Sequence, residues 1–128
     1  MHMSKIIFFV VIFLTSCGGG DVEDGFDYTP PLYGSIAVNA NGSAAISANH
    51  SSQKLANDSA NNSCGAGCST ALEFGSYKCG SLARATNTPT FGWSSNSRKS
   101  TAESNAVTQC TNNNGVGCAV ILSECNDS

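Results

Sequence analysis

A spacing of small residues and cysteine that occurs twice constrains the fold of this chain more than any other feature. Alanine, alanine and cysteine follow one another at four-residue intervals in two places, Ala56, Ala60 and Cys64, and then, at a constant offset, Ala102, Ala106 and Cys110. Residues four apart lie on one face of an α-helix, and small side chains there let the helix pack closely on a sheet. The chain is therefore predicted to contain two related halves, each built around one such helix.

Strand-like segments flank both predicted helices. Residues 33–39 and 43–49 are predicted to form a hairpin with a glycine turn, and residues 82–86 and 90–94 are its weaker counterpart. A further strand follows each helix, at 69–75 and at 118–125. Each half is thus predicted to be β-β-α-β. Two halves give an α+β fold, an antiparallel sheet of about six strands with two helices packed on it.

The start of the second helix has two candidate caps. Ser100-Thr101-Ala102-Glu103 has the form of a capping box, in which serine and glutamate satisfy free backbone N–H groups. Alternatively, the helix begins earlier, with Ser97 as its cap.

The amino terminus predicts export and lipid anchoring. Lys5 is followed by an apolar run at 6–14 that is too short for a permanent membrane span. The LTSC sequence that ends at Cys17 resembles the lipobox of bacterial lipoproteins, in which the cysteine thiol receives a diacylglycerol and the peptide is cut just before it. The predicted parts are a signal peptide at 1–16, a lipidated flexible tether at 17–32 and one domain at 33–128.

With Cys17 assigned to lipid, six of the seven cysteines remain, and an even set in a short exported domain predicts disulfides. The repeat divides them three to each half, so that complete pairing requires a bridge between the halves. Cys64 and Cys68 are one helical turn apart, and Cys110 and Cys118 can close the corresponding helix-to-strand loop. The predicted pairs are Cys64–Cys68, Cys110–Cys118 and, as the crossing bridge, Cys79–Cys125.

Metal and nucleic acid are both disfavoured. Zinc needs four suitably spaced ligands, whereas the cysteine spacing fits poorly and His50 is the only histidine of the domain, so no metal or cofactor is predicted. From residue 33 onward, five basic residues balance five acidic ones, and no basic stripe for nucleic acid occurs.

The opening YGSIAV, the two Ala-Ala-Cys helices, CGSLA from Cys79 and a closing C-x6-C together resemble the family known as domain of unknown function 4189, a group of small exported bacterial domains. The resemblance covers about three quarters of the chain and implies an α+β exported module without an established activity. Asn57 and Asn61 stand where acidic or long helix-forming residues are usual, so the first helix is predicted to be shorter or frayed.

Two residues are candidates for a functional site. His50 lies near Ser51, Ser52 and Asp58, which supply the residue types of a hydrolase triad, although a histidine at a strand-to-helix junction is more often a surface or capping residue. Trp93 is predicted to be either a core residue or an exposed anchor for a partner.

The function predicted from these features is non-enzymatic binding in the bacterial cell envelope. The domain would be held to a membrane through the lipid on Cys17, and Gly18 after the cysteine favours the outer membrane under the sorting rule of enteric bacteria. Its partner would be a protein or another envelope component, with an inhibitor or immunity protein as one version. The alternatives are an envelope hydrolase that uses His50 and a purely structural lipoprotein.

Overall fold

The computed structural model describes residues 28–86 and 89–127 of the chain. The predicted α+β class and the order β-β-α-β within each half are confirmed. The first half consists of β2 (Tyr33–Val38), β3 (Ala44–His50), α1 (Gln53–Cys64) and β4 (Ser69–Phe74). The second half consists of β5 (Cys79–Arg84), β6 (Phe91–Asn96), α2 (Lys99–Asn112) and β7 (Ala119–Cys125).

Each half forms its own three-stranded antiparallel sheet, in the orders β3-β2-β4 and β6-β5-β7. The prediction of one continuous sheet is therefore wrong. The first strand of each half lies in the centre of its sheet, and both of its edges are paired within that half. The halves consequently meet through the faces of their sheets rather than through strand edges.

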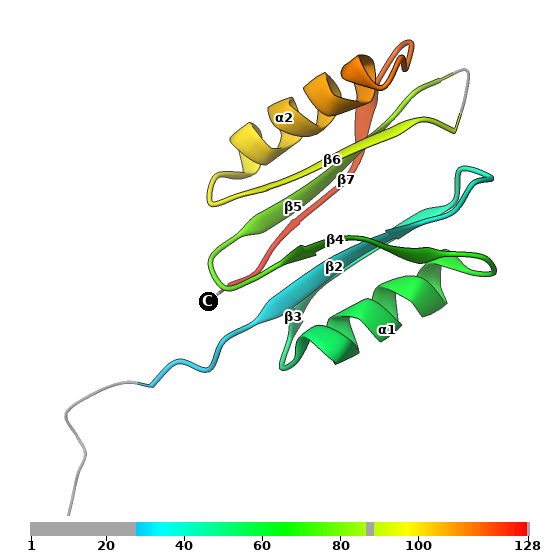
Figure 1. Ribbon diagram of the computed structural model, residues 1–128. Helices are drawn as coiled ribbons and strands as arrows, with labels where there is room; N and C mark the ends of the chain where they lie inside the picture. Colours follow the sequence, from blue (N-terminus) through cyan, green and yellow to red (C-terminus); the bar gives the residue numbers. More distant parts are fainter. Residues whose placement is uncertain (1–27, 87–88, 128) are drawn as a thin grey trace, which may run out of the picture.

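The layers follow the order helix, sheet, sheet, helix (Figure 1). Helix α1 packs on β2 and β3, and α2 packs on β5 and β6. Between the sheets, a buried cluster joins both halves through Ile36, Phe74, Leu82 and Phe91. A second cluster, Ala83, Ala85, Ala106 and Cys110, lies between the second sheet and α2. Each sheet is therefore covered on one face by its helix and on the other by the opposite sheet.

The repeat continues into the two central strands, which read YGSIAV in β2 and CGSLAR in β5. Both are buried almost without interruption, as expected for strands that are covered on both faces. The Phe74 ring lies against Gly34 of β2 and Gly80 of β5, and a Cβ atom at either glycine would overlap it. One phenylalanine thus fills a gap that two equivalent glycines leave open.

The predicted helix faces are confirmed, because Ala56, Ala60, Ala102 and Ala106 are completely buried. Helix α1 has 12 residues and α2 has 14, so the first helix is the shorter one, as expected.

The two helices begin differently. The side chain of Ser52 caps α1 by accepting the N–H of Leu55 at 3.1 Å. The capping box at Ser100 and the alternative cap Ser97 are both wrong, since α2 begins at Lys99 with Arg98 as its N-cap residue and without a side-chain cap bond. The oxygen Oδ1 of Asn96 instead accepts the Arg98 N–H at 3.0 Å, which fixes the turn that precedes the helix.

The structure contains three disulfides, Cys64–Cys68, Cys79–Cys125 and Cys110–Cys118, which are the pairs that the sequence predicts. The assignment of Cys79 to the first half is wrong, however, because this residue begins β5 and lies opposite Cys125 of β7. Four cysteines therefore belong to the second half and two to the first, and none of these three disulfides crosses between the halves. The halves are therefore held together by the apolar cluster between the sheets and by hydrogen bonds between them.

Candidate binding site

An open hollow lies where the edge strands β4 and β6 of the two sheets approach each other. Its volume is about 380 Å³, within the range of about 300–1,000 Å³ that is usual for small-molecule sites. The described residues that line it come from both halves: Val38, Asn39, Ala40, Gly67, Ser69, Pro89, Thr90, Phe91, Trp93 and Asn113. We call it the Trp93 hollow.

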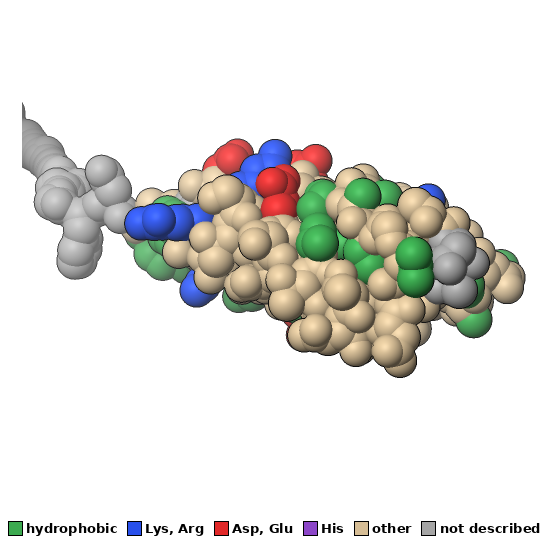
Figure 2. Space-filling model, turned by 90° about the horizontal axis from the view of Figure 1, so that it is seen from above, with side chains coloured by type: hydrophobic (Ala, Val, Ile, Leu, Met, Phe, Trp, Pro, Cys, Tyr) green, Lys and Arg blue, Asp and Glu red, His purple; other side chains and the backbone are tan. Residues whose placement is uncertain are grey.

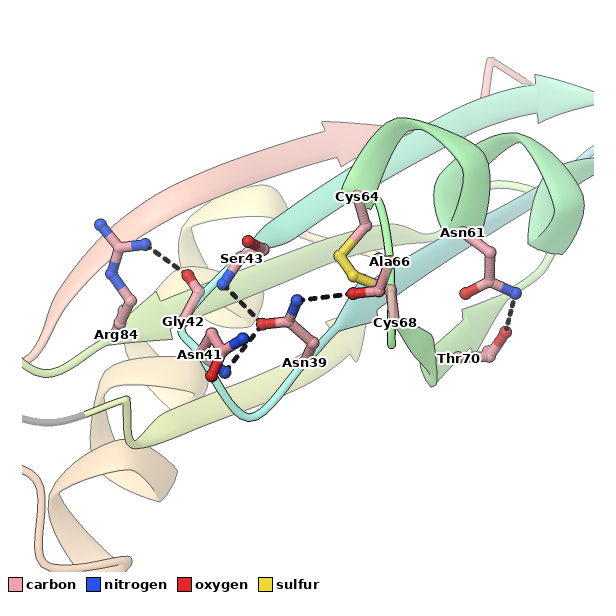
Figure 3. Close-up of a disulfide and its surroundings, with 10 residues drawn as sticks. All are labelled: Asn39, Asn41, Gly42, Ser43, Asn61, Cys64, Ala66, Cys68, Thr70 and Arg84. Atoms are coloured by element: carbon pink, nitrogen blue, oxygen red, sulfur yellow. Dashed lines mark hydrogen bonds between the residues drawn. A yellow bond between two sulfur atoms is a disulfide. The ribbon is translucent and has the colours of Figure 1, made fainter.

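The first half supplies a rim of turns that hold one another in place (Figure 3). Asn39 lies at the centre of this rim, because its Oδ1 accepts the N–H groups of Asn41 and Ser43 at 2.9 and 3.0 Å. Its Nδ2 donates to the carbonyl of Ala66 at 3.0 Å, inside the loop that the Cys64–Cys68 disulfide closes. The short disulfide thus fixes the loop that carries Gly67, and Asn39 ties this loop to the turn between β2 and β3.

The second half reaches the same rim. The guanidinium group of Arg84 donates from Nη1 to the carbonyl of Gly42 at 2.8 Å, across from β5 to the β2–β3 turn (Figure 3). On the opposite wall, Nδ2 of Asn113 donates to the carbonyl of Phe91 at 2.9 Å. Both walls are therefore held by hydrogen bonds before any ligand enters, which lowers the entropy lost on binding.

Trp93 lies partly in the core and partly at the surface. It packs against the apolar cluster between the sheets and also lines the hollow, so it is half-buried. Its backbone N–H donates to Oε1 of Gln109 on α2 at 2.7 Å. This bond fixes the backbone of β6 against α2, and the indole lies at the boundary between core and surface.

The hollow has no ionisable side chain among its described lining residues. Those residues offer aromatic and aliphatic surface, the carboxamides of Asn39 and Asn113, and the hydroxyls of Ser69 and Thr90. Figure 2 shows a face of the molecule on which uncharged side chains and backbone make up most of the surface. Such a lining suits the binding of a neutral ligand by apolar contact and hydrogen bonds.

The residues of the hydrolase alternative have other partners. His50 ends β3 and lies opposite Tyr33 of β2, outside the residues that line the hollow. Ser52 caps α1, and Asp58 forms an exposed ion pair with Lys54 at 2.7 Å. The hydrogen bond and the charge of Asp58 raise the pKa of Lys54 above its ordinary value. The structure thus gives Ser52 and Asp58 roles in the first helix.

Of the described residues that line the hollow, sequence reasoning singled out Trp93 alone and missed the polar ones, among them Asn39 and Asn113. Both lie in asparagine-rich turns whose sequence is typical of solvated loops. Only the packing of the two sheets against each other brings these two residues to one hollow. The Asn-Ala-Asn-Gly sequence of 39–42 could have indicated that the Asn39 side chain bonds its own turn, since asparagine often accepts the N–H two residues on.

Two further findings concern membranes and metals. Among residues 28–86 and 89–127, no helix is long and apolar enough to cross a bilayer. Within the same ranges, no group of three or more histidine, cysteine, aspartate or glutamate residues is placed to hold a metal ion. Cys17, the predicted lipidation site, lies outside the described residues.

The fold and the site together define a class, a duplicated α+β domain that contains disulfides and has an open hollow between its halves. The chain matches the family described as Domain of unknown function (DUF4189) over residues 33–125, and it belongs to that family. Comparison with curated proteins gave no match, and neither did comparison with solved structures.

Proposed function

We propose that this protein is a lipid-anchored lipoprotein of the bacterial envelope, at the outer membrane, whose domain binds another envelope component without catalysing a reaction. The lipid on Cys17 would retain the domain near the membrane, since several acyl chains anchor far more firmly than one. An inhibitor or immunity protein is a concrete version of this role.

The observation that supports binding is the Trp93 hollow. Its walls come from both halves and are held by hydrogen bonds, and its described lining has no ionisable side chain that could act as a general acid or base or activate a hydroxyl. A fixed, neutral surface that combines aromatic and amide groups is suited to recognition. His50 lies outside the lining of the hollow, and Ser52 and Asp58 are bonded within α1, so the hydrolase is the weaker candidate.

Photo-crosslinking in intact cells tests the binding role. A benzophenone amino acid replaces Ser69, which is exposed on the rim of the hollow, or Ser104, which is exposed on α2 away from it. We expect a discrete adduct with the Ser69 variant that is absent with the Ser104 variant. The same pattern of adducts from both positions would contradict a specific binding surface at the hollow.

A further inference from the structure

Building on the proposed binding role, we propose that the Trp93 hollow is a subsite for a neutral glycan chain, in which a sugar ring lies on Trp93 and hydroxyl or acetamido groups bond to Asn113 and its neighbours. A sugar ring presents C–H groups on its faces and hydroxyls around its edge. A site for it therefore needs an apolar platform beside amide and hydroxyl groups, and the hollow supplies both.

The charge of the hollow excludes other classes of ligand. None of its described lining residues carries a charge, and the nearby Arg84 is held by the carbonyl of Gly42. Phosphate-containing and strongly acidic ligands are usually bound by arginine or lysine, and nucleic acid by a basic surface. A neutral ligand is the class that requires no such group.

A protein partner fits this place less well than a glycan. Docked proteins bury about 800 Å² on each side around large apolar anchors. The large hydrophobic side chains that are most exposed in the described residues are Tyr28, Leu55, Tyr77, Val116, Val120 and Ile121. None of these lines the hollow, whereas an open hollow lets a polymer pass through it with one or two units bound.

The duplication provides an internal comparison. Trp93 pairs with Leu82 of its central strand, and the equivalent pair in the first half is Ile46 with Ile36. At the turn end of the same two strands, Phe91 pairs with Arg84, and the equivalent pair in the first half is Ala44 with Val38. The two aromatic side chains of the hollow thus occur in one half and are aliphatic in the other. This difference places the half-buried Trp93 next to the buried Phe91 on one side of the hollow.

The position of the hollow in the domain also suits a glycan-binding protein that is anchored to a membrane. Strand β2 begins at Tyr33, where the tether ends, and runs to Val38 in the lining of the hollow (Figure 1). Six strand residues span about 20 Å at about 3.3 Å each. The hollow therefore lies at the end of the domain away from the chain that leads to Cys17.

Fluorescence tests this inference directly, because Trp93 is the only tryptophan of the chain. The full-length chain, purified in detergent, is titrated with the hexamer of N-acetylglucosamine and separately with maltohexaose, and its pelleting with purified peptidoglycan sacculi is measured. We expect a saturable change in Trp93 emission with at least one oligosaccharide and retention on the sacculi. If the site requires an acetamido group, the N-acetylglucosamine hexamer should bind more tightly than maltohexaose.

Three variants locate the site. Trp93→Ile introduces the residue of the first half and should weaken retention about tenfold, as the loss of a stacking aromatic surface predicts. Asn113→Ala, which removes the carboxamide that bonds the carbonyl of Phe91, should weaken sugar binding severalfold, and the adjacent Asn112→Ala, outside the hollow, should not.

The outcomes separate this inference from the proposed function. Absence of binding to both sugars and to sacculi overturns the glycan site, as does binding that is equal in Asn113→Ala and Asn112→Ala. A protein adduct at the Ser69 position together with absent sugar binding would keep the binding role and replace the glycan by a protein. Absence of sugar binding together with absence of a specific adduct at the Ser69 position would overturn both proposals.

Discussion

Asn49 and Asn126 bond to each other across the boundary between the two halves. The Asn49 N–H donates to Oδ1 of Asn126 at 2.8 Å, and Oδ1 of Asn49 accepts the N–H of Asp127 at 2.8 Å. Asn49 has a φ of 64°, in the left-handed region that asparagine tolerates better than most residues. Nδ2 of Asn126 also donates to the carbonyls of Phe74 and Gly75 at 3.1 and 2.7 Å. The residue after the last cysteine thus ties the end of β7 to β3 and β4.

Asn126→Ala should therefore be strongly destabilising. Asn126 is 5% exposed, and its removal leaves backbone groups of the first half without their partners. Each buried polar group that loses its partner costs about 1–3 kcal/mol, so we expect a loss of about 3 kcal/mol in the free energy of unfolding. Chemical denaturation measures this. Asn105→Ala, at an exposed position of α2, is the control and should change stability by less than about 0.5 kcal/mol.

Local periodicity and the repeat were sufficient to predict the order of elements and the buried helix faces. The pair Cys79–Cys125 was predicted from the premise that a bridge crosses between the halves, and that premise is wrong. The division into two sheets was not predictable in this way, because strand spacing does not specify whether two halves join by edges or by faces. The hydrogen bond between Asn49 and Asn126 was not predictable for a related reason. This bond joins residues that are 77 apart in the chain, a distance over which local periodicity carries no information. The Trp93 hollow likewise exists only after the sheets have packed.

Gly34→Ala should disturb the layer between the sheets. The added Cβ would overlap the ring of Phe74, which is 2% exposed and has little room to move. Overpacking of this kind costs about 1–3 kcal/mol. Gly75→Ala is the matched control, since a Cβ there has nothing within 4 Å. Thermal unfolding should separate the two variants.

A double-mutant cycle checks the cause of the Gly34 effect. Phe74→Ala alone should cost about 3–5 kcal/mol, because it leaves a cavity between the sheets. Gly34→Ala combined with Phe74→Ala should cost less than the sum of the single changes, since the added methyl group then enters the space of the ring. Additive costs would show that the glycine is needed for another reason.

The disulfides should contribute unequally to stability. Cys79–Cys125 closes a separation of 46 residues, and the loop-entropy relation gives about 4 kcal/mol for it. Cys64–Cys68 closes a separation of 4 residues and should contribute about 2 kcal/mol. Replacing each pair by alanine and measuring unfolding in denaturant tests this order. Non-reducing peptide mapping checks the pairs themselves, and a peptide that joins Cys64 to Cys79 would refute them.

The Cys64–Cys68 pair should also affect the hollow. Its removal frees the loop that holds Ala66, to which Asn39 donates. We expect ligand retention by the hollow to fall severalfold while the domain remains folded at 25 °C. Removal of Cys79–Cys125, which lies outside the rim, serves as the comparison. If both changes affect retention only in proportion to the fraction unfolded, the disulfide loop has no separate role in the site.

His50→Ala should leave the biological effect of the protein intact. His50 lies at the end of β3, outside the lining of the hollow, and the neighbouring Ser52 and Asp58 are bonded within α1. The measurement is an assay of the cellular phenotype of the deletion strain, complemented by the variant, with thermal stability as the control. Loss of complementation at unchanged stability would favour the hydrolase.

Cys17→Ala should abolish lipidation. The thiol is the nucleophile that receives the diacylglycerol, and alanine has no group to replace it. The variant should therefore remain uncut or be released in soluble form, and labelling with a radioactive fatty acid followed by membrane fractionation distinguishes it from the parent chain. Ser16→Ala is the control, because a small residue before the cysteine is retained and labelling should persist. Equal label in the Cys17 variant and the parent would exclude Cys17 as the anchor, and with it the proposed orientation of the hollow away from the membrane.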